Sequence, residues 1–302
     1  MDFRELKKFL KSLGRDYDVP GYDCCVYYDH VYVFRDKGGM SDVNSSKKVS
    51  GKDLYFLHSG AKLMCCVAVM QLVERYKLSL KDNVCDYIDN FDSSYTVEKF
   101  LHDYSANLKN ENDICNHMNM VRLIENSSGV SFGEFIRDNI TEPLKMKSTT
   151  FELNEKNMSK IASQYFYDKS KSKATECDTN VRDMFEKNVG SLITGVEDYI
   201  KLCETICNQG LSEKNYRLLS PYSVDKLINE IIYNETEKCG AYVSVGYHGS
   251  LVLIDIKKRI SIVYAQHMKN IDSDRLDMYP KLRKIAYECI GVDTWSKGYT
   301  VL

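Results

Sequence analysis

One stretch of this 302-residue chain constrains its fold more than any other. Leu57 to Lys77 reads LHSGAKLMCCVAVMQLVERYK, and from Leu63 to Val73 apolar side chains occur on almost every side of a helix. A helix that is apolar all round lies in the centre of a protein, because each of its faces must be covered. The rest of the chain must therefore supply elements that pack around this helix.

Residues near both ends of the chain have the pattern of β-strands. Aromatic and β-branched runs at Tyr22 to Tyr28 and Val31 to Arg35 are separated by Asp29-His30, which predicts a β-hairpin. Three runs far downstream predict an antiparallel meander: Ala241 to Val245, Ser250 to Asp255 and Ile260 to Ala265. We expect both ends to share one sheet, with the long region between them entirely helical.

Helix signals are clear at the two ends of the chain. Met1 to Leu13 is amphipathic and is followed by Gly14, and Pro280 to Ile290 repeats at helical spacing before Gly291. The middle region carries three start signals, which are the capping boxes Ser131/Glu134 and Thr194/Glu197 and the pair Ser220-Pro221.

These elements predict an α+β fold in which an antiparallel sheet formed by both chain ends is flanked by helices and carries an inserted α-rich lobe. The composition, 43% hydrophobic and 28% charged, is that of a globular protein. We expect residues 1–302 to form a single domain. Its sheet lobe would comprise about 1–54 and 239–302 and its helical lobe about 55–238.

Charge and cysteine content narrow the possible partners. Lysine and arginine number 41 against 43 acidic residues, so nothing points to nucleic acid or to an acidic membrane. The 11 cysteines lack CxxC pairs and metal-type spacing, so neither a disulfide framework nor a metal site is expected. No signal peptide or membrane span is apparent, which favours the cytoplasm. We expect no cofactor and a small-molecule or peptide-like substrate, while the sequence leaves the oligomeric state open.

Ser59 and Lys62 begin the apolar helix and face the same way within its first turn. Burial of an ammonium group lowers its pKa, so a neutral Lys62 could take the proton of the Ser59 hydroxyl. The alternative is a helix cap beside a lysine that reaches solvent. The same S-x-x-K spacing recurs at three serines, of which none starts an apolar helix: Ser45, Ser170 and Ser223.

Several stretches of the chain resemble the penicillin-recognising serine hydrolases, and they follow one another in the order found in that family. That family includes class C β-lactamases, D-alanyl-D-alanine carboxypeptidases and esterases, and S-x-x-K is the first of its three motifs. The resemblance implies an acyl-enzyme hydrolase with Ser59 as nucleophile and Lys62 as proton acceptor. It also implies an oxyanion hole made by the N–H of Ser59 and one N–H near the last strands. The matching stretches are HSGAKLMCCVAVMQLVERYKLSLKDNVCDYIDNF, TVEKFLHDYS, RLIENSSGVSFGEFIRDNITEPLKMKSTTF, VGSLITGVEDYIKL and GYHGSLVLIDIKKRISIVYAQH.

The second motif of that family, Tyr-x-Asn, is degenerate in this chain. Its aligned position begins at Asn112, and a shift of two residues would place Asn116 as the asparagine. Ser105 and Asn107 instead fit the S-x-N form of other branches of the family. Each of these residues could equally cap a helix or a turn.

The third motif, Lys/His-Thr/Ser-Gly, aligns with Ser244-Val245-Gly246 and lacks its cation. Lys238 or His248 could supply one, since strand alternation would point Ser244, Gly246 and His248 to one face. Two functions are therefore open. The chain is either a serine hydrolase of an amide or ester, or a catalytically impaired relative kept for ligand binding or assembly.

Overall fold

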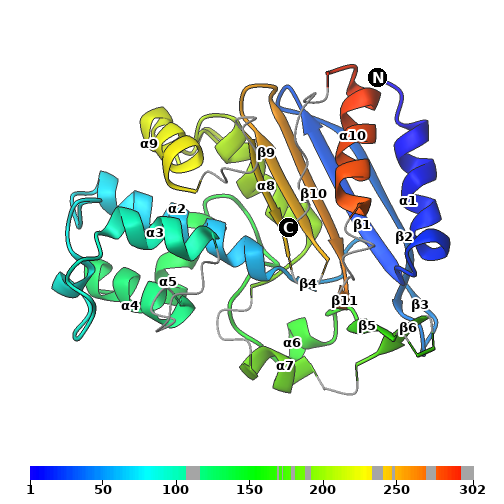
Figure 1. The fold of residues 1–302 in the computed structure, drawn as a ribbon, viewed down its shortest axis with the longest axis horizontal. Coiled ribbons are helices and arrows are strands. Elements are labelled where there is room, and N and C mark those ends of the chain that lie inside the picture. Colours follow the sequence, from blue (N-terminus) through cyan, green and yellow to red (C-terminus); the bar gives the residue numbers. More distant parts are fainter. Residues whose placement is uncertain are drawn as a thin grey trace.

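The computed structural model describes residues 1–106, 116–168, 170–171, 173–177, 181–187, 192–232, 241–246, 249–269 and 277–293. Its largest sheet has six strands in the order β3-β2-β1-β10-β9-β8, and each neighbouring pair is antiparallel (Figure 1). Because β1 pairs with β10, both ends of the chain share this sheet, as the sequence predicts. The strands are β1 (Gly21–Tyr28), β2 (Val31–Asp42), β3 (Lys47–Lys48), β8 (Ala241–Val245), β9 (Leu251–Asp255) and β10 (Ile260–Gln266).

Both faces of the sheet are buried, which explains why its central strands are apolar at almost every position. Along β10, Ile262 and Tyr264 pack into the cluster that contains α1 (Arg4–Asp16) and α10 (Met278–Ile290). Val263 and Ala265 point the other way, into the cluster that contains α2 (His58–Glu74) and α8 (Val196–Cys207). The sheet is therefore the middle layer between two sets of helices.

The helices of the outer layer come from the two ends of the chain. Leu6, Leu10 and Leu13 are the buried residues of α1, and α1 and α10 lie side by side on one face of the sheet (Figure 1). The prediction that α1 stops at Gly14 is wrong by two residues, because its backbone stays helical to Asp16.

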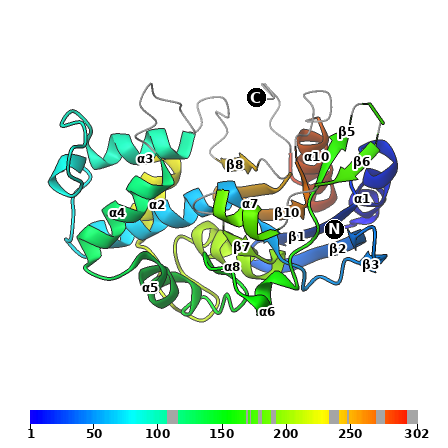
Figure 2. The ribbon, with the colours of Figure 1, turned by 90° about the horizontal axis from the view of Figure 1, so that it is seen from below.

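The apolar helix predicted to be central is α2. From Ala61 to Leu72 every residue except Lys62 is buried. Around it pack α3 (Val97–Ala106), α4 (His117–Ser128) and α5 (Phe132–Ile136), which lie at the opposite end of the molecule from α1 and α10 (Figure 2). The boundaries of the two predicted lobes stay a prediction.

The middle of the chain is not entirely helical, which corrects one expectation. Strands β5 (Tyr165–Asp168) and β6 (Lys173–Glu176) form a small sheet with β11 (Met268–Lys269), and β4 (Tyr55–Phe56) pairs with β7 (Ile193–Thr194). These strands are only two to four residues long, too short for a periodicity to predict them. The other described elements are η1 (Val84–Asp86), η2 (Arg137–Thr141), α6 (Glu155–Met158), α7 (Val181–Lys187), α9 (Pro221–Lys226) and η3 (Leu227–Ile231).

Two of the three predicted helix starts are confirmed. The Ser131 hydroxyl accepts the N–H of Glu134 at the start of α5, and Ser220 caps α9 with Pro221 as its first residue. The third is wrong, because Gly195 is the N-cap of α8. Thr194 belongs to β7, and its hydroxyl bonds instead to the Thr149 hydroxyl at 2.7 Å. In the part of the chain that the structure describes, no helix combines the length and hydropathy needed to cross a membrane.

Candidate active site

The first turn of α2 is held by the short ribbon that β4 forms with β7. Tyr55 pairs with Thr194, and directly after β4 the N–H of Leu57 donates to the carbonyl of Leu192 at 2.9 Å. Leu57 is the N-cap of α2, and its own carbonyl accepts the N–H of Ala61 at 3.0 Å. The backbone of Ser59 lies in this first turn, while its side chain falls outside the described atoms. The helix N-terminus is thus anchored to the start of α8.

Lys62 follows three residues after Ser59 and is the one residue not fully buried between Ala61 and Leu72. Its Nζ lies 5.6 Å from the centre of the Tyr104 ring on α3. Burial lowers the pKa of Lys62, and the Cys66 thiol one turn further along acts weakly in the opposite direction. A lysine whose pKa is lowered by burial is a better proton acceptor than one in water.

The spacing Ser223/Lys226 in α9 is an internal control for this environment. Lys226 Nζ lies 2.7 Å from a carboxylate oxygen of Glu98 and also pairs with Glu230, one turn later. These two carboxylates raise the pKa of Lys226. Identical spacing in a helix therefore gives opposite pKa shifts, and only the Ser59/Lys62 pair has the shift that suits a base.

Tyr104, which adjoins Lys62, and His117, its hydrogen-bond partner, were not predicted as site residues. The Tyr104 hydroxyl and Nδ1 of His117 are 2.9 Å apart, and the His117 ring stacks on Phe151. Burial raises the pKa of Tyr104 well above its ordinary value and lowers that of His117 to about 4, so both groups are neutral near pH 7. Tyr104 follows Phe100 at helical spacing, a pattern that predicts a core residue and hides its contact with Lys62.

The candidates for the second motif are engaged in local structure wherever the structure describes them. The Ser105 hydroxyl donates to the carbonyl of His102 in its own helix, at 2.8 Å. Asn116 is the N-cap of α4, and its side chain accepts the N–H of Asn119 at 3.0 Å. Asn107 and Asn112 lie outside the described residues.

The third-motif position lies on the edge strand β8, which contacts α2. Tyr242 of β8 packs into the cluster around α2, whereas Val243 packs into the cluster on the opposite face of the sheet. Strand alternation therefore places Ser244 on the same side as Tyr242, facing α2, and Gly246 follows the end of the strand. Burial raises the pKa of Tyr242, and a hydrogen bond with Ser244 opposes that shift. Lys238 and His248 lie outside the described residues.

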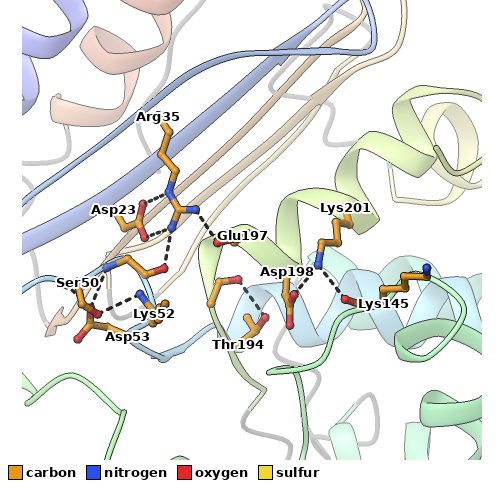
Figure 3. A network of polar contacts seen from close by, with 12 residues as sticks. Asp23, Arg35, Ser50, Lys52, Asp53, Lys145, Thr194, Glu197, Asp198 and Lys201 are labelled. Atoms are coloured by element: carbon orange, nitrogen blue, oxygen red, sulfur yellow. Dashed lines mark hydrogen bonds and ion pairs between the residues drawn. The ribbon is translucent and has the colours of Figure 1, made fainter. Parts of the chain in front are cut away.

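The segment that resembles the family around Thr194 and Asp198 has a structural role. Asp198 Oδ2 accepts the N–H of Ser148 at 2.6 Å. Asp198 Oδ1 accepts a hydrogen bond from Lys201, which also donates to the carbonyl of Lys145 (Figure 3). These contacts join α8 to the turn that follows η2. The polar side chains of this stretch therefore hold two segments of the fold together.

A second polar network lies beside β1 and β2. Arg35 of β2 donates to both carboxylate oxygens of Asp23, to Glu197 of α8 and to the carbonyl of Gly51 (Figure 3). Asp53 accepts the N–H and hydroxyl of Ser50 nearby. Across the described ranges, no group of three His, Cys, Asp or Glu side chains is arranged to hold a metal ion.

The six-stranded antiparallel sheet flanked by helices, with a Ser-x-x-Lys turn at the start of a central helix, defines a β-lactamase/transpeptidase-like fold. The sequence profile of the Beta-lactamase family matches residues 6–102 and 116–285, most of the chain. The chain therefore belongs to the Beta-lactamase family. No curated protein sequence matches it.

Solved structures share the fold at low sequence identity. The octameric penicillin-binding protein homologue from Pyrococcus abyssi is 18% identical, with a TM-score of 0.71 over 97% of this chain and 78% of that one. Unliganded simvastatin synthase (LovD) from Aspergillus terreus is 14% identical, with a TM-score of 0.77 over 94% and 97% of the two chains. A family VIII carboxylesterase is 15% identical, with a TM-score of 0.74 over 95% and 97%.

Proposed function

We propose that the chain is a serine hydrolase that cleaves an ester or amide through an acyl-enzyme on Ser59, with Lys62 as the proton acceptor. The observation that carries the proposal is the environment of Lys62. It lies one turn after the start of a buried helix, and burial lowers its pKa. Its neutral fraction at a given pH is therefore larger than that of a lysine in water.

The chemistry needs only groups of this chain and water. The Ser59 oxygen attacks the substrate carbonyl carbon as its proton passes to the Lys62 nitrogen. The tetrahedral intermediate then collapses, and the leaving group departs with the proton held by Lys62. Water adds to the acyl-enzyme in the same way and releases the acid. The N-terminus of α2 is positive and favours the oxyanion, to which the N–H of Ser59 and one near β8 would donate.

A noncatalytic protein of the same fold, kept for ligand binding or assembly, is the second candidate. It is favoured by the second-motif positions, since the hydroxyl of Ser105 and the side chain of Asn116 are both used in local helix contacts. Under this alternative the Ser59/Lys62 turn persists without turnover. The substrate of the hydrolase, or the ligand of the noncatalytic protein, is a small molecule or a peptide-like compound.

Covalent labelling decides between the two candidates. The native chain is treated with a neutral fluorophosphonate at pH 8, and the adduct is mapped by mass spectrometry in wild type, Ser59→Ala and Ser223→Ala. Ser223 is the matched control because it also precedes a lysine by three residues in a helix. We expect an adduct on Ser59 in wild type and Ser223→Ala, and its loss in Ser59→Ala.

Hydrolysis of a panel of p-nitrophenyl esters gives the same comparison for turnover. Loss of a nucleophile commonly costs several orders of magnitude in kcat. The rate of ester hydrolysis by Ser59→Ala should therefore fall to that of the uncatalysed reaction in buffer. Equal rates in wild type and Ser59→Ala, together with no adduct on Ser59, would refute the hydrolase and favour the noncatalytic candidate.

A further inference from the structure

The Tyr199 side chain of α8 is hydrogen-bonded to the turn that carries Ser59. Its hydroxyl donates to the carbonyl of Gly60 at 2.8 Å, and Tyr199 is fully buried. Gly60 is the next residue after Ser59, so this bond acts one peptide away from the proposed nucleophile. A buried hydroxyl needs such an acceptor, and here the acceptor is part of the site.

The ring of Tyr199 also explains the residue type at position 60. A Cβ atom added to Gly60 would lie 2.9 Å from the Tyr199 ring and 3.1 Å from its hydroxyl oxygen. Real Cβ atoms do not approach neighbours that closely, so a larger residue would displace either the ring or the helix turn. Glycine is otherwise unfavourable inside a helix, by about 1 kcal/mol relative to alanine, which makes its presence here informative.

The same two segments are joined a second time before their helices begin. Tyr55 and Phe56 of β4 pair with Thr194 and Ile193 of β7. Tyr199 and Gly60 each lie five residues beyond the pair formed by Thr194 and Tyr55. The start of α2 is therefore fixed to α8 at the ribbon and again at the hydroxyl of Tyr199.

We infer that Tyr199 is a positioning residue, whose ring and hydroxyl together fix the turn from which Ser59 acts. The inference rests on the proposed function. Tyr199 contacts the backbone of the turn, and its buried hydroxyl keeps its proton because burial raises its pKa far above neutrality. It takes no part in proton transfer. Its effect is on geometry, to which reaction rates respond steeply: a shift of about 1 Å can cost about 100-fold.

The first test is Tyr199→Phe, which keeps the ring and removes the hydroxyl. Its control is Tyr216→Phe, because the Tyr216 hydroxyl also donates to a backbone carbonyl, that of Asn139, at 3.0 Å. That bond lies near Gln71 in the C-terminal half of α2. Both variants lose one neutral hydrogen bond, so their midpoints of thermal unfolding should fall by similar amounts.

The readouts are the second-order rate of fluorophosphonate labelling at Ser59 and the separate kcat and KM values for an ester. We expect Tyr199→Phe to lower the labelling rate and kcat by about 10-fold, with KM within about 2-fold of wild type. Tyr216→Phe should leave both rates within about 2-fold. If the two variants behave alike while wild type is labelled, the positioning role is wrong and the proposed function stands. If wild type itself is not labelled, both are wrong.

A double-mutant cycle tests the steric part of the inference. Gly60→Ala is made in wild type and in Tyr199→Leu, in which the ring no longer opposes the new methyl group. We expect Gly60→Ala to lower the labelling rate by at least about 10-fold in the wild-type background and by less than about 3-fold in the Tyr199→Leu background. If Gly60→Ala lowers the labelling rate by the same factor in both backgrounds, the Tyr199 ring is not the reason why position 60 requires glycine.

Discussion

The first turns of α2 and the hairpin of β1 and β2 each hold a largely buried cation, with opposite consequences. Lys62 lies over the Tyr104 ring, and burial lowers the pKa of its amine. Burial alone would also lower the pKa of Arg35, but its bonds to Asp23 and Glu197 outweigh that effect and raise it. Ion pairs with carboxylates hold a buried cation in its charged form, whereas burial by itself favours release of the proton.

The same difference separates the cation with the proposed chemical role, Lys62, from a structural one, Arg35. Arg35 donates to groups of three segments, β1, α8 and the loop at Gly51, so it ties the sheet to its covering helix. The side chain of Asp23 is 1% exposed and depends on Arg35 for its charge balance. Removing Lys62 should therefore affect chemistry more than folding, and removing Arg35 should do the reverse.

The largest effect is expected for Lys62→Met, a substitution of similar length that removes the amine. Without a proton acceptor, the rate of labelling at Ser59 and the kcat/KM for ester hydrolysis should fall by about 10³-fold. The midpoint of thermal unfolding should not fall, because a buried ammonium costs free energy at neutral pH. Both quantities are measured on the same preparations.

Lys226→Met is the matched control, since Lys226 also follows a helical serine by three residues but pairs with Glu98 and Glu230. Its labelling rate should stay within about 2-fold of wild type. A labelling rate for Lys62→Met as high as that of Lys226→Met would remove Lys62 from the proposed mechanism and leave the two S-x-x-K pairs equivalent.

The next effect is on stability and concerns Arg35→Met. Breaking a buried ion pair leaves the Asp23 carboxylate without its partner, so the free energy of unfolding should fall by about 3 kcal/mol. The labelling rate of the folded protein should change by less than about 3-fold. Chemical denaturation followed by circular dichroism measures the first quantity and mass spectrometry the second.

The double variant Asp23→Asn/Arg35→Met sharpens this result, because it removes the stranded charge. It should recover part of the stability lost in Arg35→Met. If Arg35→Met instead unfolds no more easily than wild type but loses labelling, Arg35 belongs with the site, and the contrast with Lys62 fails.

The contrast between the two regions also shows what sequence patterns can and cannot predict. The strands of the main sheet follow from long β-branched runs, and α2 follows from an apolar segment too uniform for a surface helix. The place of Ser59 and Lys62 in the first turns of α2 is predictable because their spacing and the helix around them are local properties. The shared sheet is predictable because the strand runs cluster at the two chain ends.

The residues that the sequence did not reveal act across long separations. Tyr199 meets Gly60 from 139 positions away, and Tyr104 meets His117 across residues 107–115. Both tyrosines have the helical spacing of ordinary core residues, so nothing local distinguishes them. The prediction that Thr194 caps α8 is wrong for a similar reason, because the hydroxyl of Thr194 bonds to that of Thr149, which lies 45 residues away in the sequence.

The smallest effect is a shift in pH dependence and tests why the pKa of Lys62 is low. Replacing Tyr104 by leucine removes the ring beside the amine and admits water. The pKa of Lys62 should then rise toward its ordinary value, because the relief of burial outweighs the loss of the cation–π contact, which favours the charged amine. Because neutral Lys62 is the active form in the proposed mechanism, the acid limb of the kcat/KM profile should move to higher pH, and the rate at pH 7 should fall. Tyr104→Phe keeps the ring and loses only the hydroxyl, with its bonds to His117 and to the Cys65 thiol, so its acid limb should stay near that of wild type.

The pKa of Lys62 should also set how the free energy of unfolding depends on pH in the wild type and in Tyr104→Leu. A lysine with a lowered pKa binds fewer protons in the folded chain than in the unfolded chain, so the free energy of unfolding rises with pH between the lowered and the ordinary pKa. Tyr104→Leu should flatten that rise, whereas Arg35→Met should not, because the pKa of Arg35 is raised and lies above this window. An acid limb and a stability slope unchanged in Tyr104→Leu would mean that groups other than the Tyr104 ring set the pKa of Lys62.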